Sequence, residues 1–196
     1  VIVATGVLPR DPGIPGQDGP NVLSYVDVLQ GGAPVGARVA IVGAGGIGFD
    51  VAEFLVTGED SPTVYPEAWR REWGVGDPAV NRGGLAPEGP RPAPAARQVV
   101  LLQRKAEKPG RRLGKTTGWI HRAALRMKGV EMIGGINYER IDADGVHISF
   151  GADRSAPRLV PADTIVLCAG QEPERGLADD LAARGVTAHV IGGADV

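Results

Sequence analysis

A glycine-rich stretch in the first quarter of the chain matches the pattern G-x-G-x-x-G. In such a pattern the first glycine permits a tight turn, and the second lets the backbone approach a pyrophosphate because no Cβ stands in the way. The third lets a helix pack close to a strand, and the positive end of that helix holds the phosphate. The pattern therefore predicts a dinucleotide-binding turn; the alternative is a tight turn without a ligand. Its members are Gly43, Ala44, Gly45, Gly46, Ile47 and Gly48.

Two elements must position this turn. Arg38–Val42 is a short apolar run rich in β-branched residues, which is typical of a buried strand. Phe49–Val56 places Val51, Ala52 and Leu55 on one helical face. Strand, glycine turn and helix together predict the start of a Rossmann unit, and hence an α/β fold with a parallel sheet.

Basic residues follow the second predicted strand, Gln98–Leu102. An acidic residue at the end of that strand bonds the ribose 2′-hydroxyl of NAD, whereas a basic residue accommodates the 2′-phosphate of NADP. Here the position carries Arg104 and Lys105, and residues 104–128 hold nine Lys and Arg against one Glu. The pattern favours NADPH, with Arg104 as the main phosphate contact; the alternative is a solvated basic loop and helix. The side chains expected to add charge are Lys105, Arg111 or Arg112.

An insertion, residues 57–97, separates the glycine turn from the second strand. The interval from Gly48 to Arg104 is 56 residues, against about 20 in a plain unit. The insertion holds seven of the sixteen prolines. Its predicted helix, Glu67–Trp73, carries two tryptophans four residues apart, which we expect to pack and clamp the insertion onto the body. Pro87–Ala96 is typical of a surface linker.

The remaining elements follow from hydrophobic period and turn residues. The pattern of residues 116–128 predicts an amphipathic helix. Apolar and polar residues alternate on both sides of an Asp-Gly pair, which predicts a β-hairpin that opens a meander. The apolar face expected for that helix comprises Trp119, Ile120, Ala123, Ala124 and Met127. The other expected strands are 1–5, 130–133, 136–143, 146–150, 159–160, 163–169 and 186–191; the other helices are 24–30 and 176–184; 7–20 and 170–173 are expected to be loop and turn.

Composition excludes several classes of protein. The formal net charge of −2 and pI of about 5.9 argue against a nucleic-acid partner, and no apolar run approaches the length of a membrane helix. The single cysteine, Cys168, excludes an internal disulfide and a Cys-x-x-Cys pair, and its place in a strand indicates a buried small side chain. The three histidines lack metal-ligand spacing, so we expect neither a metal site nor a catalytic residue here. A cytoplasmic setting is the default expectation.

Four motifs, in order, resemble those of two-dinucleotide flavoproteins. Val3–Gly6 resembles the Ala-Thr-Gly turn where the chain crosses between the FAD and NAD(P)H domains, and the glycine turn resembles the NAD(P)H motif. The hairpin followed by Ala162–Gly170 resembles the meander and return strand, and Ile191–Asp195 resembles the motif whose aspartate bonds the ribityl chain of FAD. The resemblance adds Thr5, Gly6, Gly170 and Asp195 to the expected cofactor contacts.

A closer resemblance is to bacterial NADPH-dependent 2,4-dienoyl-CoA reductases. It rests on Leu113–Arg122, on Gln103-Arg104, on Gly170–Pro173 and on the tryptophan-containing Trp69–Gly74. It implies NADPH and FAD here, and a preceding TIM barrel of the same polypeptide with FMN and a 4Fe–4S cluster. Hydride would pass from NADPH to FAD, and electrons onward through the cluster and FMN to a dienoyl-CoA of fatty acid β-oxidation. The resemblance implies that this segment supplies no catalytic acid or base and is inactive without the barrel.

This resemblance divides the chain into three parts. Residues 1–32 would be a remnant of the FAD-binding domain and the crossover from it, 33–170 the NAD(P)H-binding domain with its insertion, and 171–196 the return segment. Both ends are expected to be cut from a larger polypeptide. Two rivals stay open: an ADP-like structural domain of a trimethylamine-dehydrogenase-like amine oxidoreductase, and another NAD(P)H-dependent flavin enone reductase.

Overall fold

Five parallel strands form the central sheet of the computed structural model, which describes residues 1–58 and 61–195. Three of the strands, β4 (Arg38–Val42), β5 (Gln98–Gln103) and β6 (Glu131–Gly134), are those expected around the glycine turn. Adjacent strands of the sheet pair in parallel throughout. The predicted Rossmann-like sheet is therefore confirmed. Its order is β3 (Val22–Ser24), β10 (Thr164–Leu167), β4 (Arg38–Val42), β5 (Gln98–Gln103) and β6 (Glu131–Gly134).

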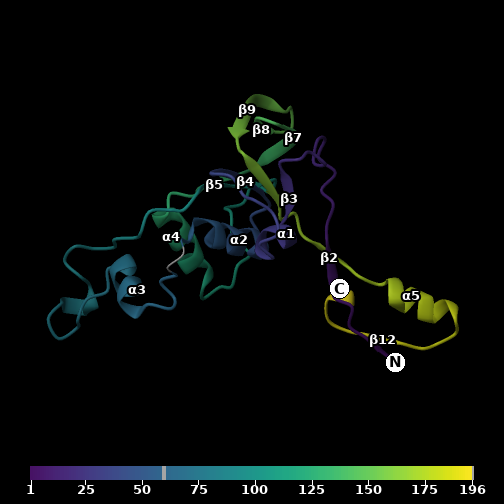
Figure 1. Ribbon diagram of the computed structural model, residues 1–196, viewed down its shortest axis with the longest axis horizontal. Helices are drawn as coiled ribbons and strands as arrows, with labels where there is room; N and C mark the ends of the chain where they lie inside the picture. The colour runs from purple at the N-terminus through teal and green to yellow at the C-terminus, as the bar shows by residue number, and fades with distance from the viewer. Residues whose placement is uncertain (59–60, 196) are drawn as a thin grey trace.

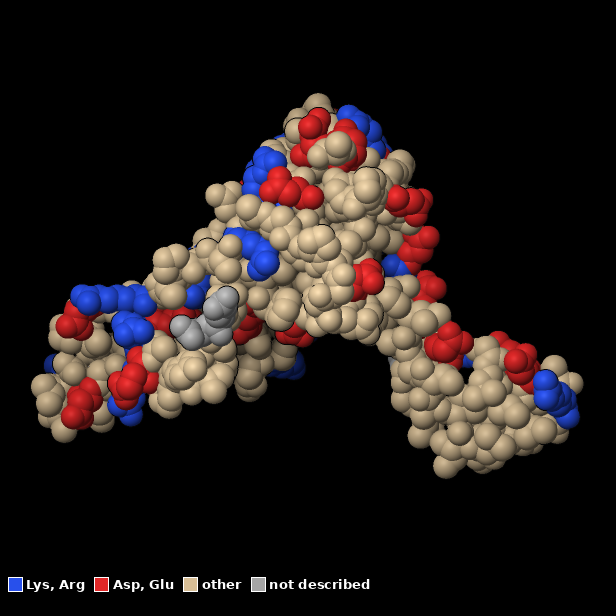
Figure 2. Space-filling model, viewed as in Figure 1, with Lys and Arg blue, Asp and Glu red and all other residues tan. Residues whose placement is uncertain are grey.

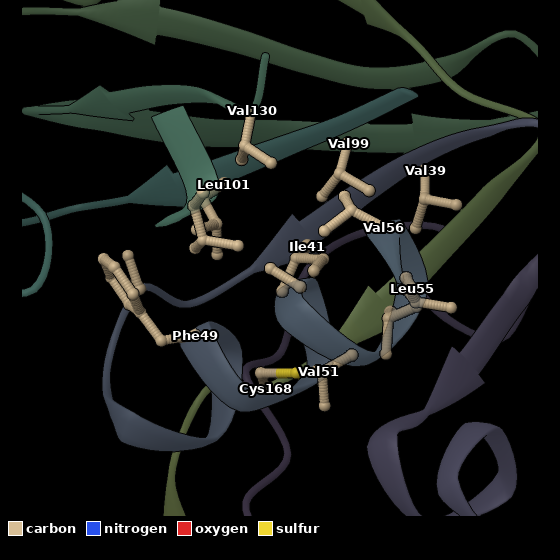
Figure 3. Close-up of a cluster of buried hydrophobic side chains, with 14 of the residues drawn as sticks. Val39, Ile41, Phe49, Val51, Leu55, Val56, Val99, Leu101, Val130 and Cys168 are labelled. Atoms are coloured by element: carbon tan, nitrogen blue, oxygen red, sulfur yellow. The ribbon is translucent and has the colours of Figure 1, made fainter. Parts of the chain in front are cut away.

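Helices cover one face of this sheet (Figure 1). They are α1 (Tyr25–Leu29), α2 (Gly46–Val56) and α4 (Gly118–Met127). Figure 3 shows Phe49, Val51 and Leu55 of α2 in the same apolar cluster as the strand residues Ile41 and Leu101, and all five are at most 1% exposed. This continuous apolar layer fixes α2, and with it the glycine turn, against the sheet.

A three-stranded antiparallel meander covers the other face. Its strands are β7 (Ile136–Asp142), β8 (Gly145–Phe150) and β9 (Ser155–Pro161). Because side chains alternate along a strand, Val39 and Ile41 of β4 face α2, whereas Ala40 and Val42 pack against the meander. The predicted hairpin is confirmed, but its turn is Ala143-Asp144 and not the expected Asp-Gly pair, because Gly145 already pairs with Asp142.

Two arms extend from this body in opposite directions (Figure 1). One is the insertion, with α3 (Pro66–Trp73) and the 3-10 helix η1 (Arg82–Gly84). The other, which we call the terminal arm, contains both described chain ends. Figure 2 shows charges of both signs over the insertion and a largely uncharged face on the terminal arm. The terminal arm comprises β1 (Ile2–Val3), α5 (Gly176–Ala183), β12 (His189–Val190) and the 3-10 helix η2 (Gly192–Ala194).

The end strands leave the central sheet and pair with each other. β1 pairs in parallel with β12, and His189 N donates to Val1 O at 2.9 Å. Both strands are shorter than predicted. A two-stranded ladder of β2 (Val7–Pro9) and β11 (Gln171–Pro173) joins this arm to the body.

Several expected boundaries are wrong. The loop and turn predicted at 7–20 and 170–173 contain β2 and β11, because prolines are tolerated at the ends of a ladder with open edges. Helix α2 begins at Gly46 and not at Phe49, because the motif's own glycines form its first turn. The strand Val22–Ser24 was not expected; its last residue, Ser24, caps α1 and forms a capping box with Asp27.

The apolar face predicted for α4 is also wrong. Trp119 and Ile120 are 59% and 36% exposed, whereas Leu125 is fully buried. Gly118 and Leu125, seven residues apart and therefore on one face, make the inward side. A Cβ at Gly118 would lie 2.8 Å from the Leu113 Cβ, so close packing at a glycine sets the helix orientation.

An ion pair joins the insertion to the body beside the two tryptophans. Trp69 is 44% exposed, and Trp73 is half-buried beside a cavity of about 220 Å³. Lys128 Nζ of α4 lies 3.1 Å from Glu72 Oε2 of α3, with side chains only 10% and 9% exposed. The same ammonium donates to Ala93 O at 2.9 Å. The insertion is thus held by an ion pair in addition to the two tryptophans, which line the cavity between α3 and α4.

Removal of the lysine should destabilise the protein. Lys128→Ala leaves the Glu72 carboxylate buried without its cation, which costs about 3–5 kcal/mol. Urea unfolding measures this loss, and Glu72→Gln combined with Lys128→Met should recover most of it. Arg70→Ala, which breaks an exposed pair with Glu67, is the control and should cost less than about 1 kcal/mol. An equally small effect of Lys128→Ala would contradict this account.

Alanine substitution at two glycines of α2 should have different effects on the free energy of unfolding. A Cβ at Gly48 would lie 1.9 Å from Gly43 O, whereas a Cβ at Gly46 would meet nothing within 4 Å. Gly48→Ala should therefore lower the free energy of unfolding by about 1–3 kcal/mol or more. Gly46→Ala should leave it unchanged or raise it by up to about 1 kcal/mol. Thermal and urea unfolding of both variants check this, and equal effects would refute it.

Candidate nucleotide site

The glycine turn lies directly against the sheet. Gly43 N donates to Leu102 O at 2.9 Å, and its φ of +114° is one that glycine adopts readily. A Cβ at Gly43 would lie 2.3 Å from Cys168 O. Backbone contact on this side leaves the opposite side of the turn open to a ligand.

The first turn of α2 has no side-chain cap. Its N-cap residue is Gly45, which has no side chain that could accept a hydrogen bond from the first turn. The N–H groups of that turn therefore remain available. A Cβ at Gly45 would meet nothing within 4 Å, which leaves open space where the motif calls for close approach by a pyrophosphate. The residues present therefore fit the phosphates of a dinucleotide at this helix end.

A cavity of about 240 Å³ brings the glycine turn together with the predicted basic side chains. Gly43, Ala44 and Gly45 form one side and Arg104 with Lys105 another. Gly46, Ile47 and Gly48 do not line it; they form the start of α2. The full lining is Pro12, Val42, Gly43, Ala44, Gly45, Gln103, Arg104, Lys105, Glu107, Arg111, Arg112, Tyr138, Cys168, Ala169 and Gly170.

Hydrogen bonds to and from its backbone fix the loop that carries the basic residues. Gln103 Nε2 donates to Lys105 O at 2.9 Å and to Glu107 O at 2.7 Å. Farther along, Gly110 N donates to Ala44 O at 3.3 Å, and Arg122 of α4 donates to Gly110 O at 2.8 Å. The loop is thus held on both sides, against β5 and against the glycine turn.

The basic side chains differ in their partners. Arg104 and Lys105 are exposed, and neither forms an ion pair with any residue in the described ranges. Arg112 Nε lies 3.1 Å from Glu107 Oε1. The charge available for an anion beside the end of β5 therefore comes from Arg104 and Lys105, and from Arg111, which lines the same cavity without an ion pair among the described residues.

Tyr138 was not expected in this cavity. It comes from β7 of the meander, and its hydroxyl donates to Leu102 O at 3.0 Å, the same carbonyl that accepts Gly43 N–H. Burial raises the pKa of Tyr138 well above its usual range, opposed by the charge of Arg104. In the sequence, the alternation of side chains along the strand places Tyr138 on the same face as Ile136. This alternation does not show which cavity a side chain of the meander reaches.

Cys168 is a buried wall of the same cavity, as its strand position predicted. Burial raises the pKa of its thiol to about 12. It remains protonated at neutral pH, so it is not suited to act as a nucleophile.

Thr5, Gly6 and Asp195 lie elsewhere, in the terminal arm, where each is hydrogen-bonded to Glu174 or Arg175. The Thr5 hydroxyl donates to Glu174 O, and Glu174 N donates to Gly6 O at 3.0 Å. Arg175 donates to the backbone oxygens of Ala194 and Asp195 at 2.9 and 3.0 Å. Of the four residues that the resemblance added, only Gly170 lies in the cavity of the glycine turn.

Two negative findings apply to the described residues alone. None of the helices there has the length and apolar character needed to cross a bilayer. No group of three or more His, Cys, Asp and Glu side chains there is placed to bind a metal ion.

Comparison with known sequences places this architecture in a family. The sequence model of the pyridine nucleotide-disulphide oxidoreductase family matches residues 1–193 of this chain. A metal reductase of Desulforamulus reducens is 26% identical over 99% of this chain and 27% of its own length. A probable ferredoxin reductase of Castellaniella defragrans is 27% identical over 91% of this chain and 36% of its own. The chain thus spans about a third or less of these relatives.

Solved structures share the fold at low sequence identity. A 2-naphthoyl-CoA reductase has a TM-score of 0.72 at 19% identity, covering 99% of this chain and 24% of that one. Histamine dehydrogenase from Rhizobium sp. 4-9 has a TM-score of 0.69 at 18% identity, covering 100% and 28%. The chain belongs to the pyridine nucleotide-disulphide oxidoreductase family, in which FAD and NAD(P) binding are typical, and forms an oxidoreductase domain of a flavoprotein.

Proposed function

We propose that this chain holds NADPH in the cavity beside the glycine turn, as part of a flavoprotein that reduces 2,4-dienoyl-CoA in fatty acid β-oxidation. The observation that carries the NADPH assignment is the presence of Arg104 and Lys105, without acidic partners among the described residues, in the same cavity as Gly45. When bound, NADPH supplies a hydride to FAD.

The chain's own residues have distinct tasks in this proposal. The first turn of α2 and the open face of Gly45 bind the pyrophosphate. Arg104 and Lys105 bind the 2′-phosphate. Tyr138 and Gly43 share the Leu102 carbonyl, which orients the turn against the sheet. None of these groups needs to transfer a proton; the domain positions and selects the cofactor.

The terminal arm is proposed to be the FAD side. Thr5, Gly6 and Asp195 all bond there to the adjacent residues Glu174 and Arg175, which supports the proposed division into residues 1–32, 33–170 and 171–196. The partner implied by the resemblance is an N-terminal barrel of the same polypeptide with FMN and a 4Fe–4S cluster. The fold shared with a 2-naphthoyl-CoA reductase is compatible with a CoA-thioester substrate. The proposal of that substrate itself rests on the sequence motifs alone.

An amine oxidoreductase of the trimethylamine-dehydrogenase type is the second candidate. The fold is about as similar to that of histamine dehydrogenase as to that of 2-naphthoyl-CoA reductase. Fold similarity therefore favours this candidate about as much as it favours a CoA-thioester reductase. In such a protein the cavity would hold an ADP-like nucleotide as a structural part. Arg104 and Lys105 argue for a 2′-phosphate, which ADP lacks. Another NAD(P)H-dependent enone reductase would share this cavity and differ elsewhere.

Replacement of Arg104 by alanine should weaken NADPH selectively. A charge-assisted contact to phosphate contributes about 1.5–3 kcal/mol, which is roughly ten- to a hundredfold in affinity. Arg104→Ala should raise the Kd of NADPH by about this factor and leave that of NADH nearly unchanged. Calorimetric titration of the purified protein with both cofactors measures this, and the difference should shrink as salt rises.

A second substitution separates the shared from the selective contacts. Gly45→Val fills the open side of the turn and should weaken both cofactors, whereas Gly32→Val, at another open glycine outside the cavity, should weaken neither. Equal loss of NADPH and NADH in Arg104→Ala would contradict the proposed 2′-phosphate contact. ADP binding as tight as NADPH binding in the unmodified protein would favour the second candidate.

A further inference from the structure

One acidic side chain lies among the basic ones around the nucleotide cavity. Among the described residues that line it, Glu107 alone is acidic, and four are basic. Its side chain is 23% exposed, against 72% for Arg112, so the carboxylate is the more enclosed member of the pair. A negative charge here opposes the phosphate that the cavity is proposed to bind.

The loop geometry keeps this carboxylate beside the cavity. The Glu107 carbonyl accepts from Gln103 Nε2 at 2.7 Å, which fixes the backbone one turn after the end of β5. The chain then reverses through Gly110, whose carbonyl is held by Arg122. This reversal returns Arg112 to Glu107, with Nε and Oε1 3.1 Å apart.

An unpaired acid at this place would have two effects. It would repel a 2′-phosphate, and it could accept a hydrogen bond from a ribose 2′-hydroxyl, as the acidic residue of NAD-binding units does. We propose that Glu107 and Arg112 together determine cofactor specificity: Arg112 neutralises Glu107 and so keeps the cavity selective for the 2′-phosphate. This inference rests on the proposed NADPH site and assigns Arg112 an indirect part in it.

A simple surface ion pair is the alternative. Such pairs contribute little to stability and nothing to selectivity. The chain offers a matched control in Arg158 and Glu131, which are 3.0 Å apart, half exposed and absent from the cavity lining. Location beside the cavity is what distinguishes the first pair from the second.

The experiment is a double-mutant cycle on the purified protein. Kd values for NADPH and NADH are measured by calorimetry for Arg112→Ala, Glu107→Gln and the double variant. Arg112→Ala should weaken NADPH about tenfold or more, because one partner's removal leaves the other charge uncompensated, while NADH binds no more weakly. Adding Glu107→Gln should recover about threefold or more of the lost NADPH affinity. Glu107→Gln alone should not weaken NADPH, and Arg158→Ala with Glu131→Gln should change neither Kd.

Each other outcome overturns the inference in a recognisable way. If the double variant binds NADPH no better than Arg112→Ala, Arg112 acts without Glu107. If Arg112→Ala weakens both cofactors equally and lowers the melting temperature, the pair only holds the loop. If the unmodified protein does not prefer NADPH, the proposed function itself fails, and that is visible before any variant is made.

Discussion

The contact between the two ends of the glycine turn is the constraint on which the rest of this structure depends. The Gly43 carbonyl occupies the place where any Cβ of residue 48 would stand, so α2 can lie this close to β4 only with glycine there. Close approach lets Phe49 and Leu55 reach the core against Ile41. The same approach directs the start of α2, with its unpaired N–H groups, toward the end of the sheet.

The cavity is therefore assembled from three layers. The sheet contributes the ends of β4, β5 and β10, the helix layer contributes the glycine turn, and the meander contributes Tyr138. The Leu102 carbonyl accepts hydrogen bonds from both the turn and Tyr138, so a single backbone oxygen connects all three. Selectivity is added by the loop after β5, whose backbone is pinned while its charged side chains remain exposed.

Local patterns predicted much of this fold. Strands β4 and β5, the hairpin and the helix after the glycine turn follow from residue period and turn chemistry over a few positions. Sequence reasoning failed where long-range packing decides: the inward face of α4 is set by Gly118 against Leu113, and the insertion is fastened by Glu72 and Lys128, 56 positions apart. In the cavity, the basic residues could be expected from their place after a strand. Tyr138 and the pairing of Glu107 could not, since both depend on how a meander and a loop fold back.

The ladder between β2 and β11 has a consequence for how the domain could be rearranged in evolution or by design. Arg10 N donates to Gly170 O at 3.0 Å, so the chain enters and leaves the body at nearly one point. A unit whose ends are adjacent can be spliced into a loop of a host protein, or permuted circularly, at little cost in loop-closure entropy. Residues 10–170 are in this sense a transferable unit. The nucleotide cavity lies wholly within this unit, because its lining runs only from Pro12 to Gly170.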